Sequence, residues 1–304
     1  MAADEWQRLT EKFDRVLDHM ETLLERAAPV KEPADPDYAS FWAFRWQRSG
    51  ESGSVAAIEH PHLTDLDDLV GVDYAKEMLV QNTAQFVAGV SANNILLWGE
   101  RGNGKSSSVK GLLKLFAPKG LRLIEVQRQD LLSLSAIAGR LRNRPYRFII
   151  FCDDLSFAEA EADYRALKTL LDGGVEERPG NVLIYATSNR RHLMPEPMTD
   201  NTGSLEIHPE EAVSEKLALS DRFGLTIGFS TFDQETFLAI VENYAGRLAI
   251  PIEREALRKE AKLWALYSGR RSGRAARQFI DDLRGRLELD TLPPLTPPKI
   301  GGGL

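Results

Sequence analysis

A short segment of the chain, Asn94–Ser107, combines residue types and a spacing that suit phosphate chemistry. Within it, Gly99–Ser106 matches the pattern G-x-x-x-x-G-K-[ST] at every position. The apolar run Ile95–Trp98 before it predicts a buried strand, and apolar residues after it recur at the spacing of an amphipathic helix. A strand on one side and a helix on the other distinguish a phosphate-binding P-loop from a glycine-rich turn with a surface lysine.

Each position of this loop has a physical task. Small residues let backbone N–H groups point inward at phosphate oxygens, and the N-terminus of the following helix adds partial positive charge. Lys105 is expected to reach the β- and γ-phosphates, and Ser106 to offer its hydroxyl to Mg²⁺. The sequence therefore predicts a site for ATP and Mg²⁺. Its expected nucleotide contacts in the loop are Gly99, Gly102, Asn103, Gly104, Lys105, Ser106 and Ser107.

Polar residues follow two further apolar runs, each of which predicts a buried strand. Asp153 and Asp154 end one run, and Asn189 follows the other. Strands that alternate with helices predict a doubly wound parallel α/β sheet, which binds ligands at the carboxyl ends of its strands. These residues are therefore expected beside the P-loop, with Asp153 as a Mg²⁺ ligand. Asp154 would orient or deprotonate the attacking water, and Asn189 would hydrogen-bond the γ-phosphate or that water.

Structural alternatives exist for these residues. Asp154 can cap the helix that follows it, and Asn189 can be a turn residue. The catalytic role is favoured for Asp154, because two adjacent carboxylates at a strand end repel each other unless a cation compensates them.

Arginines later in the chain can supply positive charge to a phosphate. Arg222, in the sequence Asp-Arg-Phe-Gly, can contact the γ-phosphate of a neighbouring subunit, a contact worth about 10³–10⁵ in rate in related NTPases. Its alternative is a surface pair with an acid such as Asp221. Arg274 and Arg277 begin the last predicted helix, where they either hold phosphate or form a basic solvent-exposed face.

The chain divides into four predicted parts. They are an N-terminal extension (1–60), a nucleotide-binding α/β domain (61–230), a small helical lid domain (231–289) and a disordered tail rich in Pro and Gly (290–304). The extension contains an amphipathic helix, a proline linker and an aromatic hairpin. Its helix, over 4–27, either binds a partner or packs on its own domain. The aromatic residues form a small core or, as the less favoured alternative, stack nucleic-acid bases.

Composition narrows the functional class. The 304 residues are 43% hydrophobic and 27% charged, which is typical of a soluble globular protein. The net charge of −7 weighs against non-specific nucleic-acid binding. The single cysteine, Cys152, lies in an apolar run and favours a reduced, cytoplasmic compartment. No apolar stretch is long enough to span a membrane, and the acidic start Met1–Glu5 is unlike a signal peptide.

The order of these motifs resembles that of AAA+ ATPases over about Leu66–Leu287. Longer strings are similar to the bacterial family of domain of unknown function 815 (DUF815), and this match extends upstream into Phe44-Arg45-Trp46. They read A-N-N-I-L-L-W-G, G-L-R-L-I-E-V, F-C-D-D-L-S-F, Y-A-T-S-N-R-R-H-L and L-S-D-R-F-G-L.

The resemblance implies a role for each motif. The roles are Walker A for Gly99–Ser106, Walker B for Asp153 and Asp154, sensor 1 for Asn189, an arginine finger across a subunit boundary for Arg222, sensor 2 for Arg274, and adenine contacts for Val70 and Gly71. One residue departs from the pattern, since AAA+ proteins usually carry Glu at the position of Asp154. The shorter side chain falls short of the usual water position, which affects turnover more than binding.

Three functions remain open. The favoured one is a homo-oligomeric ATPase that couples hydrolysis of ATP to ADP and phosphate to moving an unidentified macromolecular client, expected to be a protein. The alternative is a nucleotide-gated binding module with little turnover, which Asp154 favours. A DNA-associated loader is the third; Arg190, Arg191 and the run Arg270–Arg277 would supply its basic charge, but the net acidity weighs against it.

Overall fold

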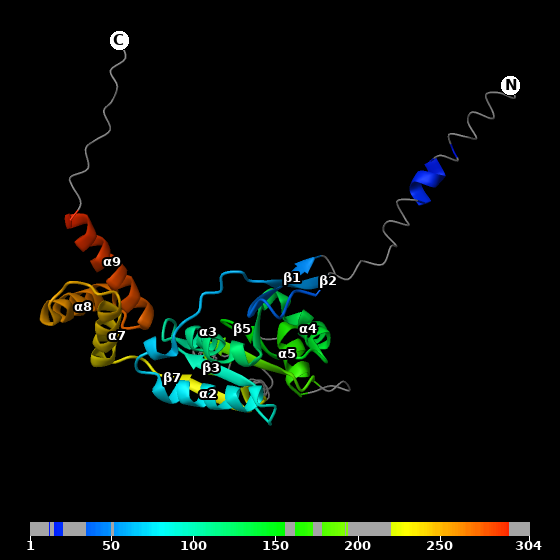
Figure 1. The fold of residues 1–304 in the computed structure, drawn as a ribbon, viewed down its shortest axis with the longest axis horizontal. Helices are drawn as coiled ribbons and strands as arrows, with labels where there is room; N and C mark the ends of the chain where they lie inside the picture. Colours follow the sequence, from blue (N-terminus) through cyan, green and yellow to red (C-terminus); the bar gives the residue numbers. More distant parts are fainter. Residues whose placement is uncertain are drawn as a thin grey trace, which may run out of the picture.

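A seven-stranded sheet forms the centre of the molecule (Figure 1). The computed structural model describes residues 12, 15–20, 35–49, 52–155, 162–172, 178–191, 193 and 220–291. The strand order is β2-β1-β4-β5-β6-β3-β7. The strands are β1 (Ala43–Ser49), β2 (Ser52–Ala57), β3 (Ile95–Gly99), β4 (Leu121–Val126), β5 (Arg147–Cys152), β6 (Val182–Ser188) and β7 (Leu225–Phe229). Neighbouring strands are parallel except for the β1–β2 hairpin.

Helices cover both faces of this sheet, and three more form a separate group. Those on the sheet are α2 (Asp73–Val87), α3 (Lys105–Phe116), α4 (Leu134–Leu141) and α5 (Ala162–Asp172). Those of the lid are α7 (Gln234–Arg247), α8 (Arg254–Ser268) and α9 (Gly273–Thr291). Short 3₁₀ helices span Leu66–Asp68, Ala117–Lys119 and Arg128–Ser133. No helix in the described part of the chain is long and apolar enough to cross a membrane.

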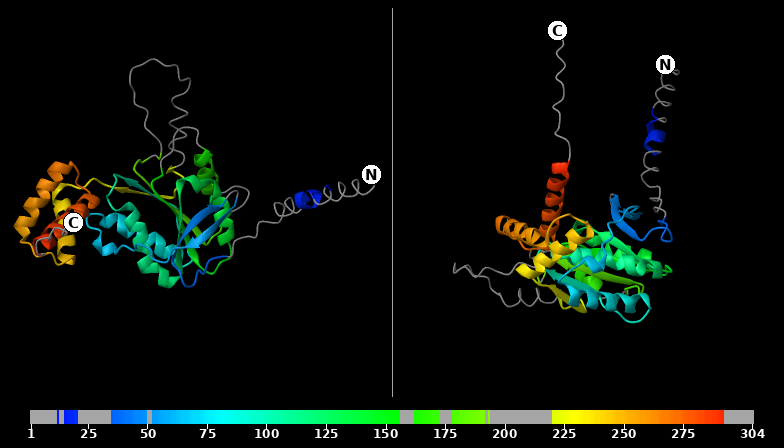
Figure 2. Two further views of the ribbon diagram at one scale, coloured as in Figure 1. Left: turned by 90° about the horizontal axis from the view of Figure 1, so that it is seen from above. Right: turned by 60° about the vertical axis from the view of Figure 1, so that its left-hand side comes forward.

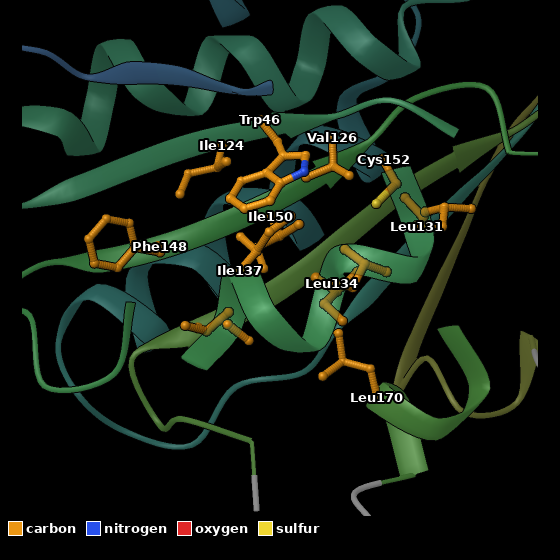
Figure 3. Close-up of a cluster of buried hydrophobic side chains, with 14 of the residues drawn as sticks. Trp46, Ile124, Val126, Leu131, Leu134, Ile137, Phe148, Ile150, Cys152 and Leu170 are labelled. Atoms are coloured by element: carbon orange, nitrogen blue, oxygen red, sulfur yellow. The ribbon is translucent and has the colours of Figure 1, made fainter. Parts of the chain in front are cut away.

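The core consists of two apolar layers, one on each face of the sheet. Trp46, Ile124 and Ile150 belong to the layer that α4 and α5 cover (Figure 3). Leu123 and Ile149, their neighbours along the strands, belong to the layer under α2 and α3. Strands buried on both faces must be apolar at nearly every position, which explains the continuous apolar runs in the sequence.

The aromatic hairpin is an edge of this central sheet. Ala43 and Phe44 of β1 pair in parallel register with Leu123 and Ile124 of β4, so the strands of the predicted N-terminal extension extend the α/β sheet. Phe44 is fully buried in the same layer as Phe148, which explains the aromatic residues here better than base stacking does. The predicted boundary after residue 60 therefore cuts through one hydrogen-bonded sheet.

Buried polar contacts hold β3, the strand that leads into the P-loop. Asn82 of α2 and Asn93 exchange two hydrogen bonds, from Asn82 Nδ2 to Asn93 O (2.9 Å) and from Asn93 N to Asn82 Oδ1 (3.0 Å). The Tyr185 hydroxyl of β6 accepts a further bond from Asn82 (3.0 Å). Burial raises the pKa of Tyr185 to about 12, so its hydroxyl stays neutral.

The lid helices lie at the end of the sheet away from the hairpin (Figures 1 and 2). Asp233 caps α7 by accepting a hydrogen bond from Thr236 N at 2.7 Å, and Glu253 caps α8 in the same way. Asn243 of α7 donates to the Asp68 carbonyl at 3.3 Å, and Arg247 forms an ion pair with the Asp68 carboxylate. The lid is thus tied to the segment that precedes the α/β core.

The predicted doubly wound sheet and helical C-terminal region are confirmed. Two boundaries differ from the predicted ones. Strand β5 ends at Cys152, so both acids lie outside the strand, and α9 continues to Thr291. Of the helix predicted over 4–27, residues 15–20 are helical, and most of the rest lies outside the described residues, as does residue 292 onward. The division into four parts stays a prediction.

Candidate nucleotide-binding site

The P-loop connects β3 to α3 through a tight backbone path. Gly99, Gly102 and Gly104 all have positive φ, at 140°, 86° and 96°. A Cβ atom on Gly99 would lie 2.2 Å from the Phe229 carbonyl oxygen, so only glycine fits where β3 meets β7. Gly104 is the N-cap of α3, which directs the N-terminus of that helix at the loop.

Lys105 lies across the loop and is anchored at three points. Its Nζ donates to the carbonyls of Gly99 and Glu100, each at 2.7 Å, and to Asn189 Oδ1 at 3.3 Å. Burial lowers the pKa of Lys105; the nearby Asp154 and Asp153 raise it again. A bound phosphate would add a further anionic neighbour to this buried ammonium.

A pair of oxygens beside Lys105 is suited to Mg²⁺. Ser106 Oγ donates to Asp153 Oδ1 at 2.6 Å, and Thr187 Oγ1 donates to the same carboxylate oxygen at 2.5 Å. Mg²⁺ prefers oxygen ligands and usually binds through one or two carboxylates, water and substrate phosphates. Among the described residues no group of three or more His, Cys, Asp or Glu could hold a metal ion.

Thr187 is a site residue that the sequence analysis missed. Its hydroxyl donates to Asp153 and also accepts a hydrogen bond from the Asp154 backbone N–H at 2.8 Å. One hydroxyl thus fixes both acids relative to each other. The signal was a threonine at the end of β6, two residues before Asn189, but a threonine inside a strand is common for reasons of packing.

Asp154 occupies an unusual backbone conformation. Its φ is +54°, a value that is uncommon for residues other than glycine and that is found more often at functional sites. Its carboxylate accepts a hydrogen bond from Asn189 Nδ2 and another from Arg101 Nη2, the latter at 3.2 Å. Asp154, Asn189 and Lys105 are therefore connected by hydrogen bonds. The alternative of a helix cap involves residues outside the described part of the chain.

A cavity of about 560 Å³ opens between the P-loop, the segment before α2 and the lid. Its apolar side includes Leu69, Val70 and Phe232, and its polar side is formed by Gly102–Ser107. Two buried side-chain oxygens among its lining residues, Thr64 Oγ1 and Asn103 Oδ1, have no hydrogen-bond partner within the described residues. Such a cavity can hold an adenine ring at one end and phosphates at the other.

The two predicted adenine contacts, Val70 and Gly71, differ in their position relative to the cavity. Val70 lines the cavity, whereas Gly71 is not among its described lining residues. Gly71 has φ +79°, and a Cβ atom there would lie 2.4 Å from Thr236 Cγ2 of α7. Its position therefore serves contact with the lid. Gly99 also lies outside this cavity, and its role is to hold Lys105 through its carbonyl.

The lid meets the P-loop through the start of α9. The Arg274 N–H donates to the Gly102 carbonyl at 3.2 Å, and the residue lines the cavity together with Arg277. A Cβ atom on Gly102 would lie 2.9 Å from Ser272 Oγ, so close approach of the lid also requires glycine. Arg274 is thus placed where it can contact a bound phosphate.

Arg222 contacts α5, one of the helices that cover the sheet. Its Nε forms an ion pair with Asp172 at the end of α5. Neither partner lines the cavity.

Comparisons with known proteins agree with this geometry. The family described as "Protein of unknown function (DUF815)" matches residues 39–287, and no curated protein sequence matches the chain. Among solved structures, the Thermotoga maritima RuvB Holliday junction branch migration motor is similar at 17% identity and a TM-score of 0.52, with 75% of this chain and 66% of that chain covered. Two mutant forms of that protein match similarly. One has 18% identity and a TM-score of 0.52, with 75% of this chain and 66% of that chain covered. The other has 19% identity and a TM-score of 0.50, with 75% of this chain and 67% of that chain covered.

This likeness shows the AAA+ fold, and the predicted fold class is confirmed. The identity is too low to carry more than the fold. This chain also spans only about two thirds of the length of the RuvB structures that it matches.

Proposed function

This chain belongs to the DUF815 family, and from that premise we propose that it binds ATP with Mg²⁺ and hydrolyses it to ADP and phosphate. The observation that carries the proposal is a hydrogen-bonded group at the P-loop. Lys105 and Ser106 line the cavity of about 560 Å³, Ser106 is bonded to Asp153, and Lys105 is connected through Asn189 to Asp154. Phosphoryl transfer depends mainly on positioning and neutralisation of charge, and these side chains match those two tasks.

Each side chain has a task in this proposal. Lys105 and the loop N–H groups hold the phosphates, while Ser106 and Asp153 hold Mg²⁺, which neutralises charge on the phosphates when bound. Asp154 accepts the proton of the attacking water as the bond between the β–γ bridging oxygen and the γ-phosphorus breaks, and ADP leaves with the electron pair. Asn189 holds the side chains of Asp154 and Lys105 in fixed positions relative to each other through two hydrogen bonds.

We further propose that the active form is a homo-oligomer. Arg222 pairs with Asp172 and is not among the lining residues of the cavity in its own chain, so we assign it to the γ-phosphate site of a neighbouring chain. Loss of that phosphate would be transmitted to the lid through Arg274, which already contacts the P-loop. The lid motion would then act on a macromolecular client in the cytoplasm.

A second function is favoured by one observation. Asp154 is held by both Arg101 and Asn189, and it is shorter than the usual Glu. A protein whose base is restrained in this way would bind ATP, turn over slowly and act as a nucleotide-gated binding module. A DNA-associated role has weaker support, because the net charge is −7.

The test is steady-state ATPase activity per subunit against protein concentration. Wild type is compared with Lys105→Ala, Arg222→Ala and, as a matched control, Arg284→Ala, which removes an exposed arginine of α9. We expect specific activity to rise with concentration, both site variants to be inactive and the control to be unchanged. Wild-type activity equal to that of Lys105→Ala at every concentration, with ATP still bound, would instead establish the gated module.

A further inference from the structure

We propose that Arg101, the third residue of the P-loop, contacts the γ-phosphate of ATP from within the same chain, and that it releases Asp154 when it does so. This inference rests on the proposed function only for the binding of ATP at this loop. It adds a second arginine to the site. Arg222 would come from a neighbouring chain, whereas Arg101 belongs to the chain that binds ATP and would move when ATP binds.

The position of Arg101 supports the first half of the proposal. It lies in the loop between Gly99 and Gly102, on the turn whose backbone surrounds the phosphates. Its Nη2 is 3.2 Å from Asp154 Oδ2, and Asp154 is in turn bonded to Asn189, which accepts from Lys105 Nζ at 3.3 Å. The guanidinium is thus linked by consecutive contacts to the ammonium that reaches the γ-phosphate.

The charges around the loop support the same placement. Arg101 and Lys105 reach the same group of side chains, since Arg101 Nη2 donates to Asp154 at 3.2 Å and Lys105 Nζ donates to Asn189 at 3.3 Å. Two cations that converge on one point repel each other unless an anion lies between them. A γ-phosphate has two charges and three acceptor oxygens and would stabilise both.

The exposure of the Arg101–Asp154 pair supports the second half. The two side chains are 73% and 55% exposed, and exposed ion pairs are weak. Guanidinium binds phosphate in a strong, charge-assisted and often bidentate geometry. Arg101 is therefore expected to exchange Asp154 for the γ-phosphate when ATP binds, and to return to Asp154 when only ADP remains.

This exchange would couple the base to the substrate. With ATP bound, Asp154 loses one hydrogen-bond donor and can accept from the attacking water. With ADP bound, the carboxylate stays paired. The arrangement would explain why a chain with a short Walker B acid carries an arginine at this loop position.

The test measures binding. Dissociation constants for ADP and for a non-hydrolysable ATP analogue, both with Mg²⁺, are determined for wild type, Arg101→Ala, Arg101→Lys and the control Arg284→Ala. We expect Arg101→Ala to weaken binding of the ATP analogue by about 10–100-fold and to leave ADP binding within about twofold, because a charge-assisted bond to the γ-phosphate is lost. Arg101→Lys should fall between, and the control should match wild type.

A double-mutant cycle tests the exchange. Asp154→Asn frees Arg101 and should strengthen binding of the ATP analogue relative to ADP by several-fold. That gain should be smaller when Arg101→Ala is already present. Equal gains in both backgrounds would show that Asp154 does not restrain Arg101.

The outcomes separate this inference from the proposed function. An unchanged preference for the ATP analogue over ADP in Arg101→Ala overturns the inference alone, provided that Lys105→Ala abolishes binding. If wild type binds neither nucleotide, both proposals are wrong.

Discussion

The two sides of the candidate site differ in how deeply their side chains are buried and how tightly hydrogen bonds hold them. On the phosphate-holding side, Lys105 is only 7% exposed and its ammonium is bonded to two backbone carbonyls. On the hydrolytic side, Asp154 and Arg101 are 55% and 73% exposed and are held mainly by each other and by Asn189. The first side is preorganised within one chain, whereas the second consists of weakly held groups.

This contrast indicates that binding and hydrolysis are separable properties of the molecule. Backbone carbonyls and glycine conformations cannot be rearranged cheaply, so the loop is ready to accept phosphates. Exposed ion pairs contribute only ~0–1 kcal/mol each and can be exchanged. Under the proposed function, hydrolysis would therefore depend on the groups that contact this exposed side, namely the nucleotide itself and Arg222 of another chain.

The largest effect that would test this contrast is expected from Asp154→Asn. The amide cannot accept the proton of water, so turnover should fall by about 10²–10⁴-fold, while the affinity for ATP stays the same or increases. Lys105→Ala should instead lose both properties. Turnover is measured under saturating ATP and affinity by calorimetry.

A matched control is Asp282→Asn, which removes an exposed carboxylate of α9 that pairs with Arg286. It should leave turnover within about twofold. If Asp154→Asn lost binding as completely as Lys105→Ala, the two sides would act as one unit and the contrast would be wrong.

A smaller effect is expected from Thr187→Val. This residue is 1% exposed, and its hydroxyl contacts both acids. The substitution would leave the Asp154 N–H unpaired, at a cost of about 1–3 kcal/mol in the free energy of unfolding. It should also raise the Mg²⁺ concentration needed for half-maximal ATP binding by about 10–100-fold, because the orientation of Asp153 is no longer fixed.

Chemical denaturation and a Mg²⁺ titration measure the two quantities. Thr226→Val, on the exposed face of β7, is the control and should change neither. A Mg²⁺ requirement that stays at the wild-type value would show that Thr187 is needed for folding only.

The elements nearest to the P-loop were predictable because one motif specifies both the loop and its flanking strand and helix. Strand β3 begins at the predicted residue Ile95 and continues one residue past the predicted Trp98, to Gly99, since an apolar run that ends at a glycine defines a buried strand. The convergence of Asp153 and Asn189 also followed from a general property of parallel sheets.

Other features depend on which surfaces meet, and a sequence pattern does not encode that. The hairpin was predicted, but its pairing with β4 joins segments about eighty residues apart. The same limit applies to Arg222, which pairs with Asp172 fifty residues away, and to Gly71, which packs on Thr236 of the lid. Local patterns identify buried positions, whereas long-range contacts decide which positions touch.

The smallest expected effect is the uptake of protons by Lys105, on the phosphate-holding side, when ATP binds. Burial lowers the pKa of Lys105 below its ordinary value of 10.5, and bound phosphates would raise it again because they favour the charged amine. At alkaline pH between the lowered and the restored pKa, ATP binding should therefore take up protons, and affinity should fall as the pH rises through the lowered value. Calorimetry in two buffers with different ionisation enthalpies measures this uptake. If binding persisted at alkaline pH without proton uptake, Lys105 would already be fully charged in the free protein, and its burial would not prepare it for phosphate.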